Sequence, residues 1–589
     1  MIKIRLSFEG RIPPDNLTKA VRRASGSMAC ESGFEQDYWR AACEVVVAYR
    51  GRAWVSEQLK SSSRFSNNTS CMIGPALGLQ HYDVLMAAYL GDKPMVEHTL
   101  VKYDVDVNAS DQYLGSAMYA AAYRGNVDIV NLLIQHGAHT SSQGHWGSCL
   151  GAAAYKGHYS VMEILINNGA DANSVGPLSP LTMSSSRGCL KAVQLLLAQP
   201  GIDVNFRDIL GHTSLVSAME GHHSKVAQLL LEREDVDASI PDDEGHTALS
   251  WAASWGDTEV AHLLLRRSDV CPNSKDCKGQ TPLRLAAGGG HHDVIKLLLA
   301  RDDLKPDFND GTNCPLWSAA TNGHDNALRL LLQKYDVEPD DYGLHSRTLL
   351  WWAAYNGRRK VVHLLLERDD VDPNLALSHT TPLMCAVEEG HEAVVQLLLD
   401  CAAVDPNITN DDQETPLAVA AKAGMETIVT MLLNRGAETD IGDLHGYTPL
   451  SLAAKHGHES VVRILLKQDG INTNAVDYLG RIPMLWAANG GYEQIFRLLL
   501  DRDDSDLNFR DKGRRSSLCL AARLDHPCIV RYLLTKNNLD VNSRDWRGRT
   551  ALYWAVVKRH TEIVDLLSGQ AEEKNHENGN LDQLEEQCI

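Results

Sequence analysis

The stretch "TPLRLAAGGGHHDVIKLLL", from Thr281 to Leu299, decides the fold of this chain. Leu283, Ala286 and Ala287 stand three and four positions apart, which is the spacing of a narrow apolar stripe along a first short helix. The opening Thr-Pro pair supplies a capping hydroxyl and a proline at the first helical position, and Gly290 ends the helix. The apolar run that closes the stretch predicts a second helix packed between neighbours.

Apolar triplets like the closing one recur along the whole chain. The triplet LLL starts at Leu195, Leu229, Leu263, Leu297, Leu330, Leu364, Leu397 and Leu498. Related triplets start at Leu132, Ile164, Met431, Ile464, Tyr532 and Asp565. The steps are 34 residues (229 minus 195) or 33 residues (330 minus 297), so one two-helix unit repeats along the sequence. Each unit is expected to bury its apolar faces against its neighbours.

One stretch, Gly446 to Leu466, carries a nearly complete unit, and Ile166 to Gly176 and Gly390 to Asp400 carry parts of it. Gly245 to Leu249, followed by two alanines, repeats the same opening. These residues resemble the ankyrin repeat. The resemblance implies an all-α repeat solenoid of helix-turn-helix units with short turns, and about fourteen repeats fit the chain.

The sequence departs from the ankyrin pattern between repeats. Many second helices end in stretches such as "ERDDVDPN" (Glu367 to Asn374), which add one residue and an acidic pair. This variant resembles long ankyrin arrays of filamentous fungi and implies a fungal origin. The acidic pairs recur at one repeat position, as at Asp302-Asp303, Asp369-Asp370 and Asp503-Asp504, which indicates a role in the turn and not acid–base chemistry.

Three segments are predicted from these patterns. Residues 1–77 fit no repeat and are expected to form a helical cap followed by a linker. A docking segment and the remnant of an effector domain are the alternatives for this segment. Residues 78–568 are the repeat array, and residues 569–589 are a polar, acidic tail expected to be disordered.

The amino-acid composition limits the classes of partner and the cellular compartments that we expect for this chain. The 56 Lys and Arg residues against 76 Asp and Glu residues give a net charge of −20, which disfavours nucleic acid and anionic membranes as partners. There is no apolar run long enough to insert into a membrane and no secretory signal, and the 13 cysteines are scattered singly. We therefore expect a monomer in the cytoplasm or the nucleus.

No motif in the chain predicts catalysis, a metal site or a cofactor. His158, His222, His291, His324, His391 and His458 each follow the end of a first helix. One histidine per repeat places the rings about 8–10 Å apart, too far to share one ion, so we expect them to fasten the inter-helix loops. "LDHPC" (Leu524 to Cys528) lacks the cysteine-rich zinc domain and the membrane helices of the palmitoyltransferases it superficially resembles. The chain is therefore expected not to be an enzyme.

The resemblance also implies where partners bind. In ankyrin repeats, partners contact the concave groove through the turn tips and the two variable residues after the alanine pair. The groove residues carried over to this chain are Tyr123, Arg124, Tyr155, Lys156, Arg187, Trp255, Tyr355, Asn356, Glu388, Glu389, Lys455, His456 and Arg523. Trp251, Trp352, Trp486 and Trp554 occupy the inner apolar position of the first helix and are expected to fill the core.

The predicted function is that of a non-catalytic scaffold or adaptor that binds other proteins through the groove. Tyr, Trp and Arg in the groove are residue types enriched at interface hot spots. The alternative is a regulatory subunit or substrate receptor that delivers partners to an enzyme complex, such as a ubiquitin ligase, through residues 1–77.

Overall fold

The computed structural model describes residues 79–578 except 104, 112–114, 145–146, 175, 177, 307–313, 336–338, 341–346, 377–379 and 503–504. The described residues form two compact bodies. The N-terminal body comprises the described residues up to Ala121 and those from Asp128 to Gly144, and the main body comprises Ala122 to Val127 and those from Gly147 onward. The predicted cap and linker in residues 1–77 lie outside the described residues.

The N-terminal body contains helices and two-residue strands. Its elements are α3 (Leu79–Leu90), α4 (Lys93–Lys102), β1 (Ser110–Asp111), β2 (Gly115–Ser116), most of α6 (Val127–Gln135) and β3 (Gln143–Gly144). Strands β1 and β2 pair antiparallel, with Ser110 opposite Ser116. Helix α5 (Ala117–Arg124) starts in this body and ends in the main body.

After residues 122–127, the main body continues with β4 (Gly147–Ser148) and then with alternating first and second helices. The first helices are α7 (Cys149–Lys156), α9 (Pro180–Ser186), α11 (Ser214–Glu220), α13 (Ala248–Trp255), α15 (Pro282–Gly289), α17 (Pro315–Asn322), α19 (Leu349–Tyr355), α21 (Pro382–Glu388), α23 (Pro416–Ala423), α25 (Pro449–His456), α27 (Pro483–Gly490), α29 (Ser517–Arg523) and α31 (Ala551–Lys558). The second helices are α8 (Tyr159–Asn167), α10 (Leu190–Leu197), α12 (Ser224–Leu231), α14 (Thr258–Leu265), α16 (His292–Leu299), α18 (Asp325–Lys334), α20 (Arg359–Leu366), α22 (Glu392–Asp400), α24 (Glu426–Asn434), α26 (Glu459–Leu465), α28 (Glu493–Leu500), α30 (Pro527–Leu534) and α32 (Thr561–Asn578).

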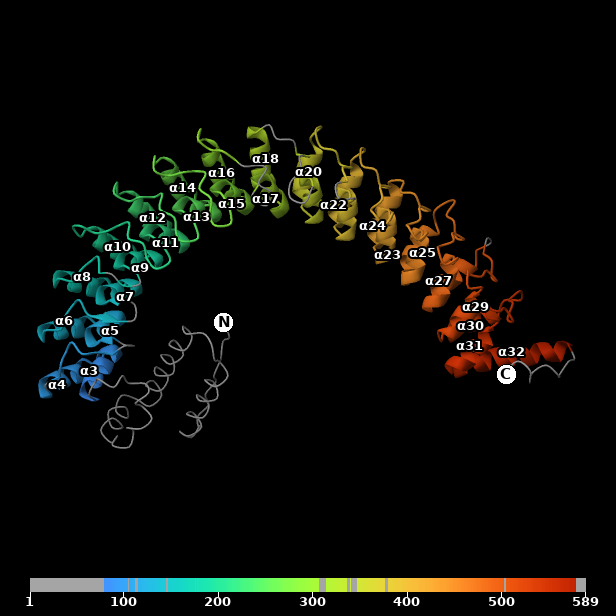
Figure 1. Cartoon of the computed structure of the whole chain (residues 1–589), viewed down its shortest axis with the longest axis horizontal. Helices are drawn as coiled ribbons and strands as arrows, with labels where there is room; N and C mark the ends of the chain where they lie inside the picture. The colour runs from blue at the N-terminus through green and yellow to red at the C-terminus, as the bar shows by residue number, and fades with distance from the viewer. Residues whose placement is uncertain are drawn as a thin grey trace. The chain divides into compact units, whose positions relative to one another are not determined.

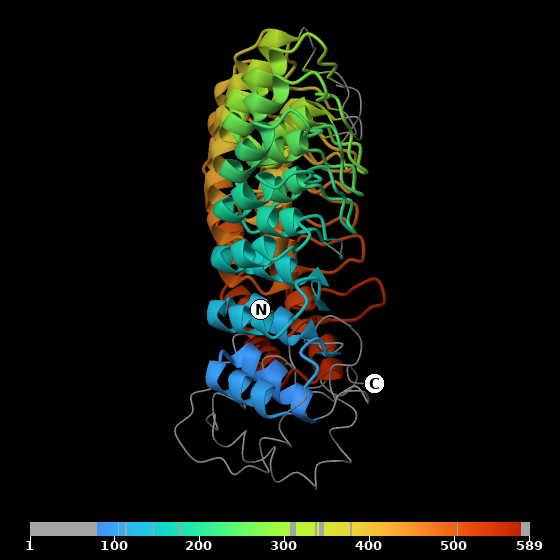
Figure 2. The same ribbon diagram turned by 90° about the vertical axis from the view of Figure 1, so that its left-hand side faces the viewer.

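Helices of the same kind pack side by side through the main body. Each first helix contacts the next first helix and its own second helix, and second helices contact second helices, as the pairs α13–α15 and α14–α16 illustrate (Figure 1). The loops between repeats gather along one edge of the stacked helices (Figure 2). The predicted all-α repeat solenoid is therefore confirmed, with thirty helices, or fifteen pairs, among the described residues of the two bodies.

The repeat that contains residues 281–299 folds as its sequence predicts. The Thr281 hydroxyl accepts a hydrogen bond from the backbone N–H of Arg284 at 3.3 Å, which caps α15. Gly290 ends the helix at a φ of +72°, a left-handed conformation that side chains with a Cβ adopt only with strain. Ala286 and Ala287 are fully buried, because the small side chains let neighbouring first helices approach closely.

Asparagine side chains tie consecutive repeats together at the turns. The Asn205 amide donates to the carbonyl of Asp235 at 2.8 Å, while its oxygen accepts from the N–H of Asp237 at 2.9 Å. Asn173, Asn374 and Asn508 make the same pair of bonds across their own repeats. These bonds satisfy backbone groups that the turns leave without a helical partner.

The C-terminal end of the array continues as a helix. Helix α32 runs from Thr561 to Asn578, so it extends into the segment 569–589 that was expected to be disordered. Residues 579–589 lie outside the described residues. The boundaries at residues 77 and 568 stay predictions.

Candidate functional site

The predicted binding residues lie at the C-terminal ends of the first helices, next to one another along the main body. Because the first helices pack side by side, these ends form one row. We call the thirteen predicted residues the first-helix row; each of them is exposed or half-buried, so all are accessible to a partner. The structure thus keeps the predicted residues on one surface of the main body.

Aromatic rings and cations alternate at the start of the row. The ammonium nitrogen of Lys156 lies 4.7 Å from the ring centroid of Tyr123 and 5.6 Å from that of Tyr155. The Arg187 guanidinium lies 4.7 Å from the Tyr155 ring. These cation–π contacts join three successive repeats and hold the four side chains against one another before any partner arrives.

Trp255 and Tyr355 each belong to an aromatic cluster. The Trp255 ring lies 3.8 Å from the His222 ring and stacks at 5.9 Å on Trp251. Tyr355 stacks on Trp351, with 5.1 Å between the ring centroids. The Arg347 guanidinium lies 3.7 Å from the centroid of the Trp351 ring. These contacts fix rings that are still partly open to solvent.

Asn356 has a different role from its neighbours in the row. Its amide donates to the carbonyl of Trp352 in the same helix at 2.9 Å, so the side chain closes the end of α19. The prediction placed it at the surface, and the structure shows that one of its polar groups is already engaged in its own helix.

The row becomes acidic at α21. Loss of solvent around its carboxyl, together with the neighbouring Glu414 and Glu389, raises the pKa of Glu388. The buried Glu414 forms an ion pair with Lys422 at 2.7 Å. A cationic partner group placed beside Glu388 and Glu389 would relieve the repulsion between these carboxylates.

The last third of the row is basic. The Lys455 ammonium lies 4.9 Å from the Trp486 ring of the next repeat, and the Arg523 guanidinium lies 4.9 Å from the Trp554 ring of its next repeat. Partial burial and the nearby Lys455 lower the pKa of His456, which favours the neutral form of its ring. The charge at this end of the row therefore comes from Lys and Arg.

The four tryptophans expected in the core are only partly there. Trp486 is buried, as predicted, but Trp251, Trp352 and Trp554 are half-buried and that expectation is wrong for them. Each of these rings contacts a member of the row and so supports it: Trp251 stacks on Trp255 at 5.9 Å, Trp352 meets Tyr355 edge-on at 5.9 Å, and Trp554 lies 4.9 Å from the Arg523 guanidinium. Sequence reasoning missed this role, although one signal was present. Asp477 and Asp545 each stand nine residues before a tryptophan and accept its indole N–H, at 2.7 and 3.1 Å.

Histidines fix the backbone beneath the row. The Nε2 of each donates to a carbonyl at the end of the preceding first helix, at 2.9–3.2 Å. The pairs are His158 to Tyr123, His223 to Ser186, His291 to Ser254, His324 to Gly288, His391 to Tyr355, His458 to Lys422, His526 to Asn489 and His560 to Arg523. The expected fastening role is confirmed, except that His223 performs it where His222 was predicted. His222 instead occupies the left-handed position, at a φ of +60°, that glycine holds in other repeats.

We expect loss of one such histidine to weaken the repeat it fastens. The substitution His291→Ala removes the bond to Ser254 and leaves that carbonyl without a protein partner, which costs about 1–2 kcal/mol. His292→Ala is the matched control, because its exposed ring bonds no backbone carbonyl of another repeat, and it should change stability by less than about 0.5 kcal/mol. Hydrogen exchange at the end of α13 measures both, and equal effects of the two substitutions would refute the role.

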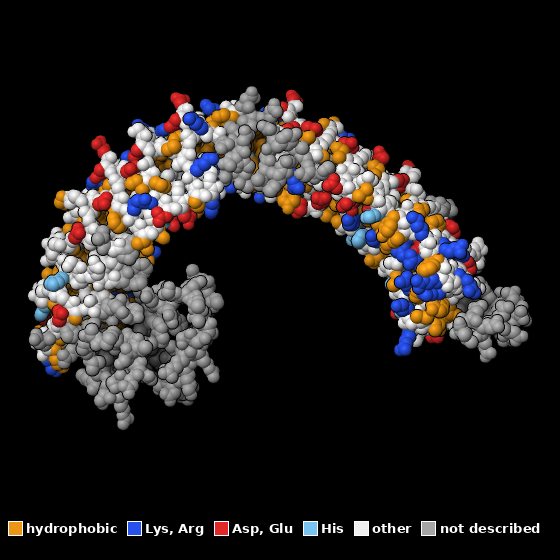
Figure 3. Space-filling model, in the orientation of Figure 1, with side chains coloured by type: hydrophobic (Ala, Val, Ile, Leu, Met, Phe, Trp, Pro, Cys, Tyr) orange, Lys and Arg blue, Asp and Glu red, His pale blue; other side chains and the backbone are white. Residues whose placement is uncertain are grey.

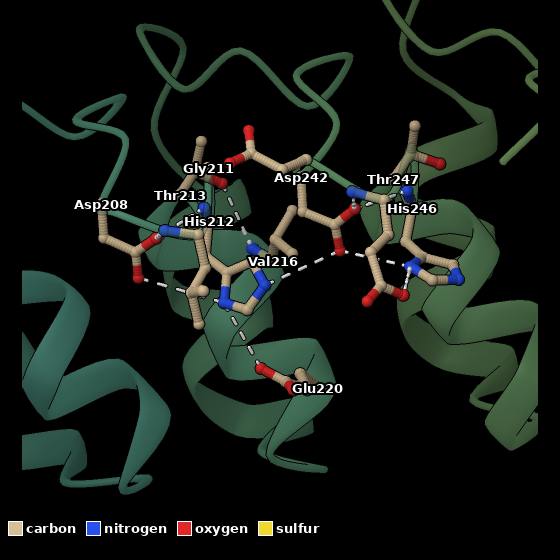
Figure 4. A network of polar contacts seen from close by, with 12 residues as sticks. Asp208, Gly211, His212, Thr213, Val216, Glu220, Asp242, His246 and Thr247 are labelled. Carbon is tan, nitrogen blue, oxygen red and sulfur yellow. Dashed lines mark hydrogen bonds and ion pairs between the residues drawn. The ribbon is translucent and has the colours of Figure 1, made fainter. Parts of the chain in front are cut away.

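Carboxylates and histidines also alternate across three repeats without forming a metal site. His212 lies between Asp208 and Asp242, and His246 lies 3.3 Å from Asp242 (Figure 4). On its other side, His246 lies 3.5 Å from Asp276. Asp242 also accepts the N–H of His246 at 2.7 Å and so shapes its turn. Within the described ranges, no group of three His, Cys, Asp or Glu side chains is arranged to hold a metal ion.

In two of the predicted acidic pairs the second aspartate serves the turn, as predicted, and the pair Asp503-Asp504 lies outside the described residues. Arg301 donates two hydrogen bonds to the Asp303 carboxylate, at 2.8 and 2.6 Å, and another to the Leu265 carbonyl of the preceding repeat at 2.6 Å. Arg368 holds Asp370 in the same bidentate way. These hydrogen bonds lower the pKa of Asp303 and of Asp370, so both carboxyls are ionised at neutral pH.

Comparison with known families agrees with this geometry. A family model described as ankyrin repeats in three copies matches residues 84–176, 181–276, 269–342, 339–410, 402–477 and 484–578, which is more than half of the chain. A comparison with curated proteins finds no match. Across the part of the chain that the structure describes, no helix is both long enough and apolar enough to cross a bilayer.

Proposed function

The chain belongs to the ankyrin-repeat family, and from this premise we propose that it is a non-catalytic scaffold or adaptor that binds other proteins through the first-helix row. Ankyrin repeats generally mediate protein–protein interaction, and proteins built from them are typically non-catalytic interaction modules. The proposal assigns this general role to a defined surface of the main body.

The observation that carries the proposal is the alternating stack of Tyr123, Lys156, Tyr155 and Arg187. Long charged side chains usually lose rotamer freedom when a partner binds, at a cost of about 0.5–1.5 kcal/mol each. Here the rings already restrain the cations, so less freedom remains to be lost. Tyr and Arg are also the residue types that dominate binding energy in interfaces.

The charge along the row supports an extended partner. The row is aromatic and basic at Tyr155 and Lys156, acidic at Glu388 and Glu389, and basic again at Arg523. A partner segment with the complementary pattern, acidic at both ends and basic in the middle, would be favoured by electrostatic complementarity. We therefore propose that the row selects partners by their charge pattern.

The test is an affinity pull-down with mass spectrometry on the double substitution Tyr155→Ala/Lys156→Glu. We expect it to lose partners that the unsubstituted chain retains, because it removes the central ring and reverses the central charge of the stack. The matched control is Tyr159→Ala/Lys191→Glu, which changes the same residue types at exposed positions on the second helices α8 and α10. If both variants are folded and retain the same partners, the first-helix row is not the binding surface.

The alternative role, delivery of partners to an enzyme complex, depends on residues 1–77. Those residues lie outside the described part of the chain, so this role stays a prediction. Expectations of a monomer without a nucleic-acid partner likewise rest on composition.

A further inference from the structure

Within the last two repeats of the main body, residues 511–560, which end before the acidic helix α32, differ in charge from the rest of the chain. Residues 511–560 contain eleven Lys and Arg residues against four Asp residues, a net charge of +7 in a chain whose total is −20. Figure 3 shows blue Lys and Arg side chains gathered with hydrophobic side chains near the C-terminal end of the described chain. The remaining residues therefore carry a net charge of −27, so this cationic region is local.

Most of these cations are not neutralised by the protein itself. Asp511 and Asp545 are buried, and Asp540 forms an ion pair with Arg510. Asp525 faces His560. No ion pair within the described residues engages the members of the following set, which we call the basic end surface: Lys512, Arg514, Arg523, Arg544, Arg547, Arg549, Lys558 and Arg559.

The basic end surface is continuous across both repeats. The N–H of Trp546 donates to the Gly513 carbonyl at 3.1 Å, which joins the two turn tips. Arg523 of one repeat and Arg549 of the next lie 4.9 and 4.8 Å from the same ring, Trp554. His560 donates to the Arg523 carbonyl, which brings the end of α31 to the same place.

Large apolar side chains stand exposed among these cations. Trp546 is 64% exposed, beside Arg547 at 4.4 Å, and Tyr553 is 43% exposed. Val556 and Val557, on α31, are 49% and 53% exposed. Cations around exposed aromatic and aliphatic groups suit a ligand that carries both carboxylates and apolar side chains.

We propose that the basic end surface binds an acidic segment of a partner protein, with its carboxylates on the Arg and Lys side chains and an apolar side chain against Trp546 or Val557. This proposal rests on the proposed function and names the partner's chemistry at one end of the row. A protein segment is favoured over nucleic acid because the −27 charge of the remaining chain would repel a polyphosphate extending beyond these two repeats. The aliphatic Val556 and Val557 also offer contact for aliphatic side chains, which nucleotides lack, while the exposed Trp546 and Tyr553 suit either ligand.

The test uses the full chain and a fluorescein-labelled peptide of repeated Glu-Glu-Leu triplets, with binding followed by fluorescence anisotropy. We expect the triple substitution Arg514→Glu/Arg547→Glu/Lys558→Glu to weaken binding at least about tenfold. The matched control, Lys225→Glu/Arg266→Glu/Lys360→Glu, makes the same change of charge at exposed cations on other repeats and should weaken binding less than about threefold. Should the reversed variant not fold, Arg547→Gln/Lys558→Gln removes charge without reversing it.

Three outcomes would overturn the proposal. One is equal weakening by the two triple substitutions, which would mean that only net charge matters. Another is tighter binding of an oligothymidylate than of the peptide, which would make the ligand a nucleic acid. The third is a gain in peptide affinity above about tenfold when residues 579–589 are deleted, which would show that the chain's own tail occupies the surface. The substitutions at Tyr155 and Lys156 do not change the basic end surface. A negative result in the pull-down test of the first-helix row can therefore be distinguished from a negative result in the peptide-binding test of this surface.

Discussion

The substitution Asp511→Ala is expected to lower the local stability of the last repeats by about 3–5 kcal/mol. The Asp511 carboxylate has no exposed surface and accepts from Arg515, at its backbone N–H and its guanidinium, at 2.9 and 2.8 Å. It also faces the Arg481 guanidinium at 3.3 Å, which is itself buried and lies 4.4 Å from the Trp486 ring. Removing the carboxylate leaves a buried cation without its counter-charge, and that penalty dominates the loss.

Hydrogen exchange in α27 and α29 measures this loss, with α11 and α13 as internal references in distant repeats. A repeat array need not unfold in one step, so a local measurement is required. The matched control is Asp540→Ala, which removes an exposed carboxylate from its ion pair with Arg510 and should cost less than about 1 kcal/mol. Asp511→Asn should fall between the two, because the amide oxygen can still accept the backbone N–H. Similar exchange in the two alanine variants would contradict the buried-pair argument.

The substitution Phe496→Ala should also cost about 3–5 kcal/mol. Phe496 is fully buried on α28, between Ile495 and Leu499 on the same buried face, and its ring meets the Tyr532 ring edge-on at 6.5 Å. Alanine leaves a cavity that the short helices on either side can fill only partly.

The graded series Phe496→Leu and Phe496→Ala separates a cavity effect from a loss of fold. We expect the leucine variant to lose much less stability than the alanine variant, since most of the buried volume remains. Leu524→Ala serves as the control, because this side chain is exposed and its loss should matter by less than about 0.5 kcal/mol. Hydrogen exchange in α28 and α30 reports all three variants, and a leucine variant as unstable as the alanine variant would point to a global defect.

The sequence alone was enough to predict the repeat and its two helices. Thr281, Gly290 and the buried alanines act within one repeat, through capping, backbone conformation and helical spacing. Such local signals recur along the chain, so a repeat with a weak signal can still be placed from the spacing of the other repeats. The positions of the thirteen residues of the first-helix row followed from the same register, which is why all of them lie on one surface.

The repeat register assigned the fastening role to the wrong histidine in one repeat, for a reason that is also local. Where other repeats end the first helix with glycine before the fastening histidine, His222 takes the left-handed position and His223 makes the bond to Ser186. Adjacent histidines cannot be told apart by composition. Only the backbone conformation assigns their roles.

The sequence by itself determined the all-α repeat architecture and the positions of the first-helix row, because both depend on spacing within a repeat. The tertiary structure decided what each side chain on that surface touches. Lys156 lies against Tyr123, Arg523 against Trp554, and Arg481 against Asp511, each across a boundary between repeats. Such pairs join residues about 30 positions apart, and whether they meet depends on the packing of neighbouring first helices, which no single repeat encodes.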